Sequence, residues 1–240
     1  MLADLVDGAR RITVLTGAGI STDSGIPDYR GPNGLWTRNP EAARMSTLAD
    51  YVADPDVRRR AWRSRQTHPA WNAEPNDGHR ALVELERSGR LVALLTQNVD
   101  GLHQRAGSDP SLVVELHGTI WRLRCTSCDQ ARDDRSVPLA EIPPRCACGA
   151  LLRPGVVWFG EALSEEAVTA SFEAARAADV VLVVGTSSLV YPAAALPQAA
   201  RAAGAFVVEI NPEPTPLTPL ADVSLRGPAA ALLPAIVEAG

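Results

Sequence analysis

The chain is 240 residues long, with 46% hydrophobic residues, 21% charged residues and a net charge of −5 at pH 7. This composition excludes a disordered protein, and the length suits one large α/β domain or a main domain with a small appendage. The acidic balance argues against a dedicated nucleic-acid binder, because such domains usually carry a basic excess. The sequence also lacks a run of about 18 apolar residues, and its N-terminus lacks a basic segment followed by an apolar one. We therefore expect a cytoplasmic protein with neither nucleic acid nor membrane among its partners.

Five continuous apolar runs predict β-strands that are buried on both faces, because their hydrophobic residues do not alternate with polar ones. In chain order they are RITVLTG (11–17), LVALLTQ (91–97), LVVELHG (112–118), VVLVVGT (180–186) and FVVEIN (206–211). Helix-like segments separate most of them: residues 77–88, which begin at Asp77, residues 164–178, which begin at Ser164, and residues 193–203, in which Pro197 predicts a kink. The alternation predicts an α/β fold with a doubly wound, Rossmann-like parallel sheet.

Two segments break this alternation. Residues 31–75 are rich in Arg, Trp and Pro and contain helical patches without a strand, and residues 121–157 contain all four cysteines. We expect a helical insertion with a cofactor loop at 31–75 and a zinc-binding module at 121–157, which together form a second, smaller lobe. The sheet domain would then comprise residues 1–30, 76–120 and 158–240. The proline-rich residues 211–219 predict a loop, with a linker as the alternative.

Each apolar run ends in glycine or polar residues, at the place where ligands bind in open parallel sheets, outside the carboxyl ends of the strands. These residues are Gly17 and Gly19, then Gln97, Asn98 and Asp100, then His117, then Gly185, Thr186 and Ser187, and finally Asn211. Turn chemistry alone explains one or two such endings. Five together predict a ligand site at this edge of the sheet.

The TGAGIS turn after the first run resembles the start of a dinucleotide-binding fingerprint. Thr22 stands where the third glycine of that fingerprint belongs, and no acidic residue closes a second strand, so a glycine-rich turn without a ligand is an alternative. His117 taken alone would more often be a hydrogen-bonded core histidine. At a strand end in this crevice, its neutral imidazole could instead take a proton from a hydroxyl near pH 7.

The cysteines form two close pairs, Cys125 with Cys128 and Cys146 with Cys148. Two such pairs across a loop suit tetrahedral coordination of Zn²⁺ by thiolates, and four sulfur ligands leave no open position for water. The spacing therefore predicts one structural zinc ion rather than a catalytic one. Four free core thiols are the alternative, which the surrounding Arg, Pro and Asp residues disfavour.

Several motifs of the chain, taken in order, resemble those of the sirtuins, which are NAD-dependent protein lysine deacylases. The motifs are GAGIS, GIPDYRGPNGLW, TQNVDGLHQRAG, ELHG, the two cysteine pairs, LLRPGVVWFGE, GTSSLVYPAA and INPE, and the resemblance runs from about residue 12 to residue 230. It implies an NAD co-substrate, a structural zinc ion, and acyl-lysine proteins or peptides as partners.

The resemblance also implies roles for individual residues. Around the NAD phosphates, the ribose and the nicotinamide pocket it puts Gly17, Ala18, Gly19, Ile26, Asp28, Tyr29, Arg30 and Trp36, with Gln97, Asn98 and Asp100 on the nicotinamide ribose. On the adenosine half it puts Gly185, Thr186, Ser187, Asn211 and Glu213, with Ala229 near the adenine. The residues Val157, Trp158, Phe159, Gly160 and Glu161 would offer an edge to which an extended peptide adds as a strand.

In the chemistry that the resemblance implies, the acyl-lysine carbonyl oxygen attacks the ribose carbon as nicotinamide leaves. His117 then deprotonates a ribose hydroxyl, and water completes the transfer. The products are free lysine, nicotinamide and 2′-O-acyl-ADP-ribose. Asn98 would position groups around the ribose, and residues 26–36 would close over the site and exclude bulk water.

Two departures from the family pattern bear on the substrate. Tyr29 stands where the usual motif has Phe, and it should still cover the reactive face. Sirtuins that prefer succinyl or malonyl groups carry a Tyr and an Arg three residues apart, where this chain has Trp62 and Arg65. Arg65 could pair with an acyl carboxylate, or residues 58–65 could form a solvated helix face. We expect deacetylation and keep desuccinylation or demalonylation, protein ADP-ribosylation and a non-enzymatic NAD-sensing module as alternatives.

Overall fold

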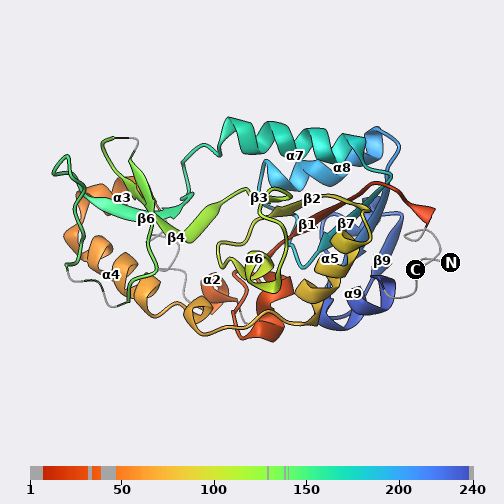
Figure 1. Cartoon of the computed structure of the whole chain (residues 1–240), viewed down its shortest axis with the longest axis horizontal. Coiled ribbons are helices and arrows are strands. Elements are labelled where there is room, and N and C mark those ends of the chain that lie inside the picture. Colours follow the sequence, from red (N-terminus) through yellow and green to blue (C-terminus); the bar gives the residue numbers. More distant parts are fainter. Residues whose placement is uncertain are drawn as a thin grey trace.

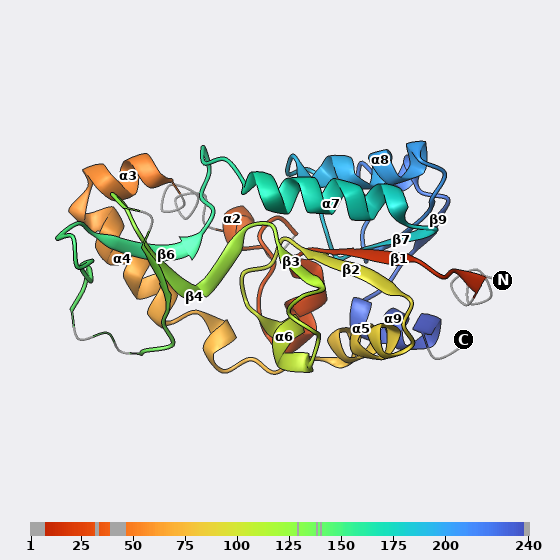
Figure 2. The ribbon, with the colours of Figure 1, turned by 45° about the horizontal axis from the view of Figure 1, so that its top comes forward.

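The computed structural model describes residues 8–31, 34–38, 47–128, 130–137, 139 and 141–237. A large sheet with helices on both faces forms one end of the elongated molecule, and a small lobe forms the other (Figure 1). The strand β4 (Gly118–Cys125) runs between the two parts, as both views show (Figure 2).

Six parallel strands form the large sheet in the order β3-β2-β1-β7-β8-β9. Five of them are the predicted strands, so the parallel α/β fold is confirmed. The sequence does not predict β9, which is a three-residue, half-buried strand at the edge of the sheet. The strand order reverses between β1 and β7, and their carboxyl ends therefore flank the crevice in which such sheets bind ligands. The strands are β1 (Ile12–Thr16), β2 (Leu91–Thr96), β3 (Val113–Glu115), β7 (Val180–Val184), β8 (Phe206–Ile210) and β9 (Val223–Leu225).

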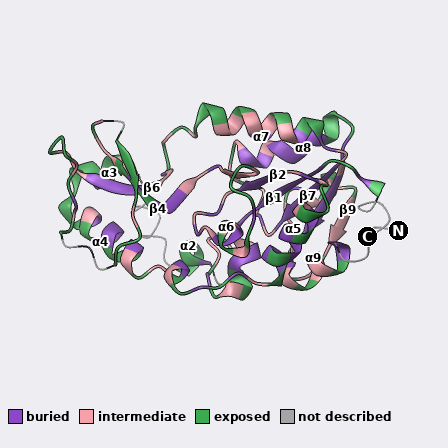
Figure 3. Ribbon diagram, viewed as in Figure 1, coloured by how far each residue is buried: buried purple, intermediate pink, exposed green. Residues whose placement is uncertain are grey.

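Neighbouring residues of the central strands pack on opposite faces of the sheet, because side chains alternate along a strand. Val14 and Leu182 pack with the helices α5 and α9, whereas Leu15 and Val183 pack with α7 and α8. Figure 3 shows the strands buried between these two helical layers. The helices are α5 (Asp77–Arg87), α7 (Glu165–Ala177), α8 (Leu196–Ala202) and α9 (Ala229–Val237).

The helix ends follow the local sequence closely, with one correction. Asn76 caps α5 through hydrogen bonds from the backbone of Gly78 and His79, and Ser164 caps α7. The single kinked helix expected over residues 193–203 is wrong: the segment splits into a 3₁₀ turn, η4 (Ala193–Ala195), and α8. Pro197 lies in the first turn of α8, where a proline needs no backbone N–H partner, so it starts a helix instead of bending one.

Shorter elements connect the strands of the large sheet. The 3₁₀ helix η1 (Ala18–Ser24) follows β1, α6 (Leu102–Ala106) follows β2, and η5 (Thr218–Leu220) precedes β9. In the described ranges, no helix combines the length and apolar character needed to cross a lipid bilayer.

The small lobe packs the helices α3 and α4 against an antiparallel sheet of order β5-β4-β6, and α2 and η3 lie between this lobe and the large sheet. Tyr51, Trp62 and Leu123 are fully buried at its centre, where the indole Nε1 of Trp62 donates to the Tyr51 hydroxyl over 2.7 Å. The sequence does not predict these short strands, and it does predict the helical character of the insertion. The domain limits given above remain our proposal. The elements are α2 (Leu35–Arg38), α3 (Leu48–Ala53), α4 (Pro55–Gln66), η3 (Pro69–Trp71), β5 (Ala131–Asp133) and β6 (Leu152–Val156).

Candidate active site

The turns after β1 and β7 are in direct backbone contact. Gly17 N donates to Val184 O over 2.9 Å, and Gly19 N donates to Gly185 O over 2.8 Å. A Cβ atom on Gly17 would lie 2.8 Å from Gly185 O, and Gly185 itself has a φ of +60°. Glycine is therefore required here so that the two turns can approach each other, whatever else they bind. The helix that follows, from Ala18, is a 3₁₀ helix rather than the α-helix of a dinucleotide fingerprint.

Side chains at the ends of β2, β7 and β8 are linked by hydrogen bonds. Gln97 Nε2 donates to Thr186 Oγ1 over 2.8 Å, and Asn211 Nδ2 donates to Thr186 O over 2.8 Å. Ser187 follows Thr186 and is half-buried, whereas Glu213 is exposed on the loop after β8. Ala229 is buried at the start of α9. These hydrogen bonds add β2 and β8 to the contact between β1 and β7. The carboxyl ends of four strands thus converge, as predicted.

Asn98 and Asp100 form a buried polar cluster under the first turn. Asn98 Nδ2 donates to Gly17 O at 3.1 Å and lies 3.3 Å from Ser21 Oγ. Asp100 Oδ2 accepts from Ser21 Oγ at 2.8 Å, and its Oδ1 accepts from Leu102 N at 2.9 Å. Burial raises the pKa of Asp100, although these two donors oppose the rise. The cluster fixes Asn98, which is 6% exposed, against the glycine turn.

His117 joins the fifth strand end to the same group. Its Nδ1 lies 2.9 Å from Gln97 O, and because a carbonyl only accepts, Nδ1 carries the proton. The neutral ring therefore has its lone pair on Nε2. Burial lowers the pKa of His117, partly offset by the hydrogen bond to Gln97, so the neutral form dominates at pH 7. This is the tautomer and the protonation state of a general base.

The segment after η1 lies beside this cluster. Ile26 is buried against Leu102 and Trp121. Asp28 O accepts from Leu35 N over 2.8 Å, which closes the loop onto the start of α2. Burial, and secondarily the nearby Asp100 carboxylate, raises the pKa of Tyr29 to about 12. Arg30 is exposed. The predicted residue Trp36 belongs to α2, and its side chain is outside the described part of the structure.

The predicted peptide edge, residues 157–161, is a tight turn tied to His117. Val157 N donates to His117 O over 2.8 Å, and Glu161 N donates to Trp158 O over 3.0 Å. Gly160 has a φ of +84°, which suits this turn. Trp158 is buried in the small lobe, whereas Phe159 is 43% exposed and forms an isolated parallel bridge with Thr47. The backbone of this segment is therefore hydrogen-bonded directly to the backbone of the histidine.

The carboxylate of Glu161 is occupied within the protein. Its Oε2 accepts from Trp158 N over 2.9 Å, and its Oε1 forms a short ion pair with the buried Arg153. Arg153 also stacks on the Trp158 ring, with Cζ 4.7 Å from the ring centroid. These contacts make Glu161 a residue that shapes the edge.

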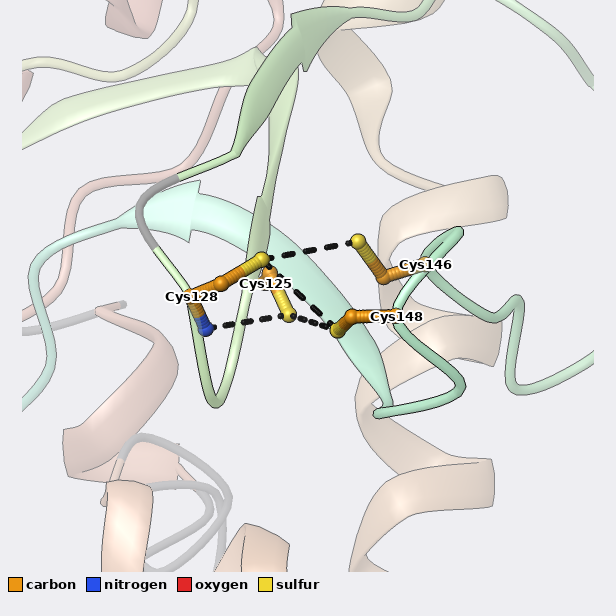
Figure 4. Close-up of side chains that lie close together, drawn as sticks. All are labelled: Cys125, Cys128, Cys146 and Cys148. Carbon is orange, nitrogen blue, oxygen red and sulfur yellow. Dashed lines mark hydrogen bonds between the residues drawn. The ribbon is translucent and has the colours of Figure 1, made fainter.

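The four cysteines lie together in the small lobe (Figure 4). The Sγ atoms of Cys125 and Cys148 are 3.5 Å apart, and Cys128 Sγ lies 3.6 Å from that of Cys148 and 3.8 Å from that of Cys146. Tetrahedral Zn²⁺ with Zn–S bonds of about 2.3 Å requires sulfur atoms about 3.8 Å apart. Two backbone N–H groups, of Cys128 and Ser127, lower the pKa of Cys125 and favour its thiolate. The predicted ligand set therefore fits a closed zinc site.

The comparisons with known proteins agree with this geometry. Residues 17–192 match the family model described as "Sir2 family". The chain belongs to the Sir2 family. The whole sirtuin is similar to "NAD-dependent protein deacylase 2" of Pyrobaculum aerophilum, with 52% identity over 99% of this chain and 94% of the relative. It is also similar to "NAD-dependent protein deacetylase 2" of Streptomyces coelicolor, with 47% identity over 96% of this chain and 98% of the relative.

Solved structures extend the similarity to this sirtuin's full fold. A mutant Sir2 homologue in complex with ADP-ribose matches with a TM-score of 0.93 and 42% identity, over 99% of this chain and 94% of that chain. A Sir2 homologue in complex with NAD matches with a TM-score of 0.89 and 44% identity, over 99% and 91%. A Sir2 protein bound to acetylated peptide matches with a TM-score of 0.85 and 32% identity, over 98% and 95%.

Two predicted substrate residues of the sirtuin lie in its interior. Trp62 is 0% and Arg65 3% exposed. Arg65 Nε donates to Ile120 O over 3.0 Å, and its Nη2 donates to Asp134 O over 2.6 Å, with the Asp134 carboxylate 3.5 Å away. Its Nη1 is buried and has no hydrogen-bond partner among the described residues. The predicted solvated helix face is therefore wrong at Arg65, which is buried. Its guanidinium already has a carboxylate partner, that of Asp134.

Sequence reasoning missed several residues that shape this sirtuin's site. Ser21 holds both Asn98 and Asp100, yet a serine in a glycine-rich turn carries no signal of its own. Thr96 Oγ1 accepts from Asn98 N over 3.0 Å, and its signal is a polar residue at the end of an otherwise apolar strand. The ion pair of Arg153 with Glu161 was open to detection, because both charges flank an apolar stretch that has no other polar side chain.

Proposed function

We propose that this Sir2-family protein is an NAD-dependent protein lysine deacylase, most active as a deacetylase. It transfers the acyl group to ADP-ribose and releases nicotinamide and 2′-O-acyl-ADP-ribose. The observation that carries the proposal is His117, whose neutral ring is held by Gln97 O with Nε2 as its lone-pair nitrogen, at the junction of five strand ends. The relatives named as NAD-dependent deacylases or deacetylases support the same reaction.

The co-substrate NAD, when bound, supplies the activated ribose to which the acyl group is transferred. Gly17, Ala18 and Gly19 then offer a backbone close enough for the phosphates, and Gln97, Asn98 and Asp100 position the nicotinamide ribose. Ile26, Asp28, Tyr29, Arg30 and Trp36 form the nicotinamide side. Gly185, Thr186, Ser187, Asn211, Glu213 and Ala229 form the adenosine side.

His117 acts as the general base in this proposal. Its Nδ1–H is held by Gln97 O, so Nε2 is the atom that accepts a proton from a ribose hydroxyl. Asn98 is the second catalytic residue and positions groups around the ribose, and the contacts of its Nδ2 with Gly17 O and Ser21 Oγ fix its amide for this role. The acylated peptide adds along the edge Val157 to Glu161. The first residue of this edge, Val157, donates its backbone N–H to the His117 carbonyl.

The zinc ion has a structural role in this proposal. Four thiolates would hold Zn²⁺ and leave no position for water, so a bound ion would neither activate a nucleophile nor polarise a carbonyl. Cys125, Cys128, Cys146 and Cys148 instead join the ends of β4 and β6 in the small lobe.

The position of Arg65 supports a preference for neutral acyl groups. Its guanidinium already has Asp134 as a partner, and pairing it with a substrate carboxylate would place two acids around one cation. Trp62 donates its only N–H to the Tyr51 hydroxyl, so Trp62 itself offers no polar group to an acidic acyl chain. We therefore expect acetyl-lysine to be used in preference to succinyl-lysine or malonyl-lysine.

A nicotinamide-release assay with an acetyl-lysine peptide and NAD tests the proposal. Release should depend on the peptide and match deacetylation mole for mole, and mass spectrometry should find 2′-O-acetyl-ADP-ribose. Labelled ADP-ribose retained on protein would instead establish a protein ADP-ribosyltransferase. NAD binding without turnover by folded protein would establish an NAD-sensing module. Parallel assays of acetyl, propionyl and succinyl versions of one peptide measure the acyl preference.

A further inference from the structure

The loop after β8 contains four prolines between residues 212 and 219. Because proline has no backbone N–H, this loop cannot hold itself together with main-chain hydrogen bonds alone. It carries Asn211 and Glu213, which the proposed function assigns to the adenosine half of NAD. Some other group must therefore fix its shape.

That group is the carboxylate of Glu209, which is 1% exposed near the end of β8. It accepts hydrogen bonds from three hydroxyls, those of Thr215, Thr218 and Ser224, with Thr218 at 2.7 Å and Ser224 at 3.0 Å. Arg226 Nη1 lies 3.0 Å from its Oε2. A buried carboxylate is tolerated only when paired and fully hydrogen-bonded, and Glu209 meets both conditions.

The pairing of β8 with β9 explains why these side chains meet at Glu209. Glu209 is opposite Ser224 in the parallel pairing of β8 with β9. Arg226 follows two residues after Ser224, so both side chains lie on the same face as Glu209. Thr215 and Thr218 come from the proline-rich loop itself, and Thr218 Oγ1 also accepts from Thr215 N at 2.8 Å.

Arg226 connects this anchor to the residues of the site. Its Nη1 also reaches the backbone oxygens of Glu213 at 3.2 Å and Asn211 at 3.4 Å, and its Nη2 donates to Thr218 Oγ1 at 3.0 Å. Asn211 in turn holds Thr186 O. A continuous set of contacts thus runs from the buried carboxylate to the turn after β7. Residues 209–226 lie outside the range matched by the family model, which ends at residue 192.

We infer that Glu209 and Arg226 are positioning residues that set the affinity for the adenosine half of NAD by holding residues 211–218 in the binding conformation. The inference rests on the proposed function. Neither residue has to touch the nucleotide for this role. Since the acyl-lysine and the nicotinamide ribose are bound by other elements, loosening the loop should weaken cofactor binding and leave the chemical step unchanged.

The test is the dissociation constant for ADP-ribose, measured by calorimetry, together with full steady-state kinetics on the intact protein. Arg226→Met, which removes the donors and keeps an unbranched apolar stem, should raise both this constant and the KM for NAD about tenfold, as expected for loss of charge-assisted hydrogen bonds. The kcat at saturating NAD and the KM for the peptide should stay within about twofold. Arg226→Lys, which keeps one charged donor, should restore part of the affinity.

Arg201→Met is the matched control. Arg201 lies on α8; its Nη1 donates to Leu220 O over 2.6 Å and its Nη2 is 3.7 Å from Asp222 Oδ1, so this variant also removes an arginine with a carbonyl contact and an ion pair, here at the far end of the connection between β8 and β9. It should bind ADP-ribose as the unchanged protein does. Glu209→Gln combined with Arg226→Met should cost less affinity than the two single effects added, because both act on one anchor.

Equal ADP-ribose affinity of folded Arg226→Met and Arg201→Met would overturn the inference, as would a fall in kcat without a change in affinity. If Arg226→Met does not fold, Thr218→Val carries the same expectation, because it frees the loop and leaves the ion pair intact. Failure of the proposed function would look different: the unchanged protein would itself neither bind ADP-ribose nor consume NAD, and both ideas would fall.

Discussion

The lone-pair nitrogen of His117 is set by a single backbone carbonyl. Gln97 O binds Nδ1 at 2.9 Å, and Gln97 is itself tied to Thr186 through its side chain. The same residue therefore orients the imidazole with its main chain and the adenosine side of the site with its amide. In the proposed function, one strand end thus contacts both the general base and the adenosine side of the cofactor site.

Replacing His117 with Ala should reduce kcat by about 10²-fold to 10⁴-fold, the usual contribution of a general base. Binding of ADP-ribose should change little, because the glycine turns and Thr186 keep their own contacts. Nicotinamide release measures the first quantity and calorimetry the second. Full turnover by the variant would remove His117 from the reaction.

The pH dependence of the unchanged enzyme should report the same group. Burial lowers the pKa of His117 below its ordinary value of about 6.5, so the base stays deprotonated at pH 7. Catalytic efficiency should then fall only at acidic pH, as the ring gains a proton, and the midpoint of that fall should lie below about 6.5. A pH profile of kcat/KM tests this, and an acidic midpoint above pH 7 would be inconsistent with it.

Two other histidines should make the fold sensitive to acid. His79 and His103 are 0% and 1% exposed, and their rings lie 5.0 Å apart. Burial, with a contribution from Arg80, lowers the pKa of His79 to about 4, and burial lowers that of His103 well below its ordinary range. The unfolded chain binds these protons near pH 6.5, so the free energy of unfolding should decrease as pH falls from about 6.5 toward 4.

The size of this effect follows from the pKa of His79. Between pH 7 and pH 5 this residue alone should cost roughly 2 kcal/mol of stability. Urea unfolding at the two pH values measures the change, and His79→Gln should make the difference smaller. Equal stability at both values would show that the two rings are not held neutral in the folded protein.

At the scale of single elements, the turn at residues 157–161 depends on a buried ion pair. Glu161→Gln keeps the shape of the side chain but leaves Arg153, which is 3% exposed, without its counter-charge. The turn should loosen, and the edge offered to a peptide backbone should lose its register. Catalytic efficiency on an acetyl-lysine peptide should fall about tenfold relative to that on the single amino acid Nε-acetyl-lysine, which has no flanking backbone.

The comparison of two substrates separates this effect from simple destabilisation, which would lower both activities together. Glu165→Gln, at an exposed acid in the first turn of α7, serves as the control for loss of one negative charge. An unchanged ratio between the two substrates in Glu161→Gln would show that the ion pair supports the fold alone.

The elements also show what could be predicted from the sequence. Fully buried strands such as β7 are predicted directly from continuous apolar runs, and their polar endings locate the site because parallel strands share one carboxyl edge. The strand β9 is not predicted, because three half-buried residues are too few to show a hydrophobic pattern. The role of Arg226, which follows this strand, is therefore not predicted either. These contacts depend on strand pairing, which local sequence does not specify.

The burial of Arg65 could have been predicted from the spacing of the apolar residues in α4. Several arginines of α4 are close together in sequence, and their number favours a solvated helix face. Val57, Ala61 and Arg65 nevertheless recur every four residues, which puts Arg65 on the apolar stripe of the helix. Its burial against the Trp62 and Trp71 rings follows from that spacing.

At the scale of the whole molecule, the zinc site should decide whether the small lobe folds. The strands β4, β5 and β6 surround a modest core, and thiolate coordination supplies folding free energy that such a lobe needs. We expect about one zinc ion per chain. A strong chelator should shift the tryptophan fluorescence to longer wavelength, because Trp62 and Trp158 are buried in this lobe. A metal-free protein that stays folded and active would contradict the assignment.

All 23 basic residues of the chain are arginine, and lysine is absent. A compositional bias of the coding sequence is the simplest origin, but it has a chemical consequence for a protein that acts on acyl-lysine. Reactive acyl donors modify neutral amines, whereas a guanidinium stays protonated because its pKa exceeds about 12. Incubation with acetyl phosphate should therefore leave the deacylase activity unchanged and add no acetyl group to a basic side chain, as read by mass spectrometry. Arg60→Lys, at an exposed position of α4, supplies the control, because this variant should gain one acetylated side chain under the same conditions. Loss of activity in the unchanged protein, with acetyl groups on other side chains, would show that the absence of lysine gives no such protection.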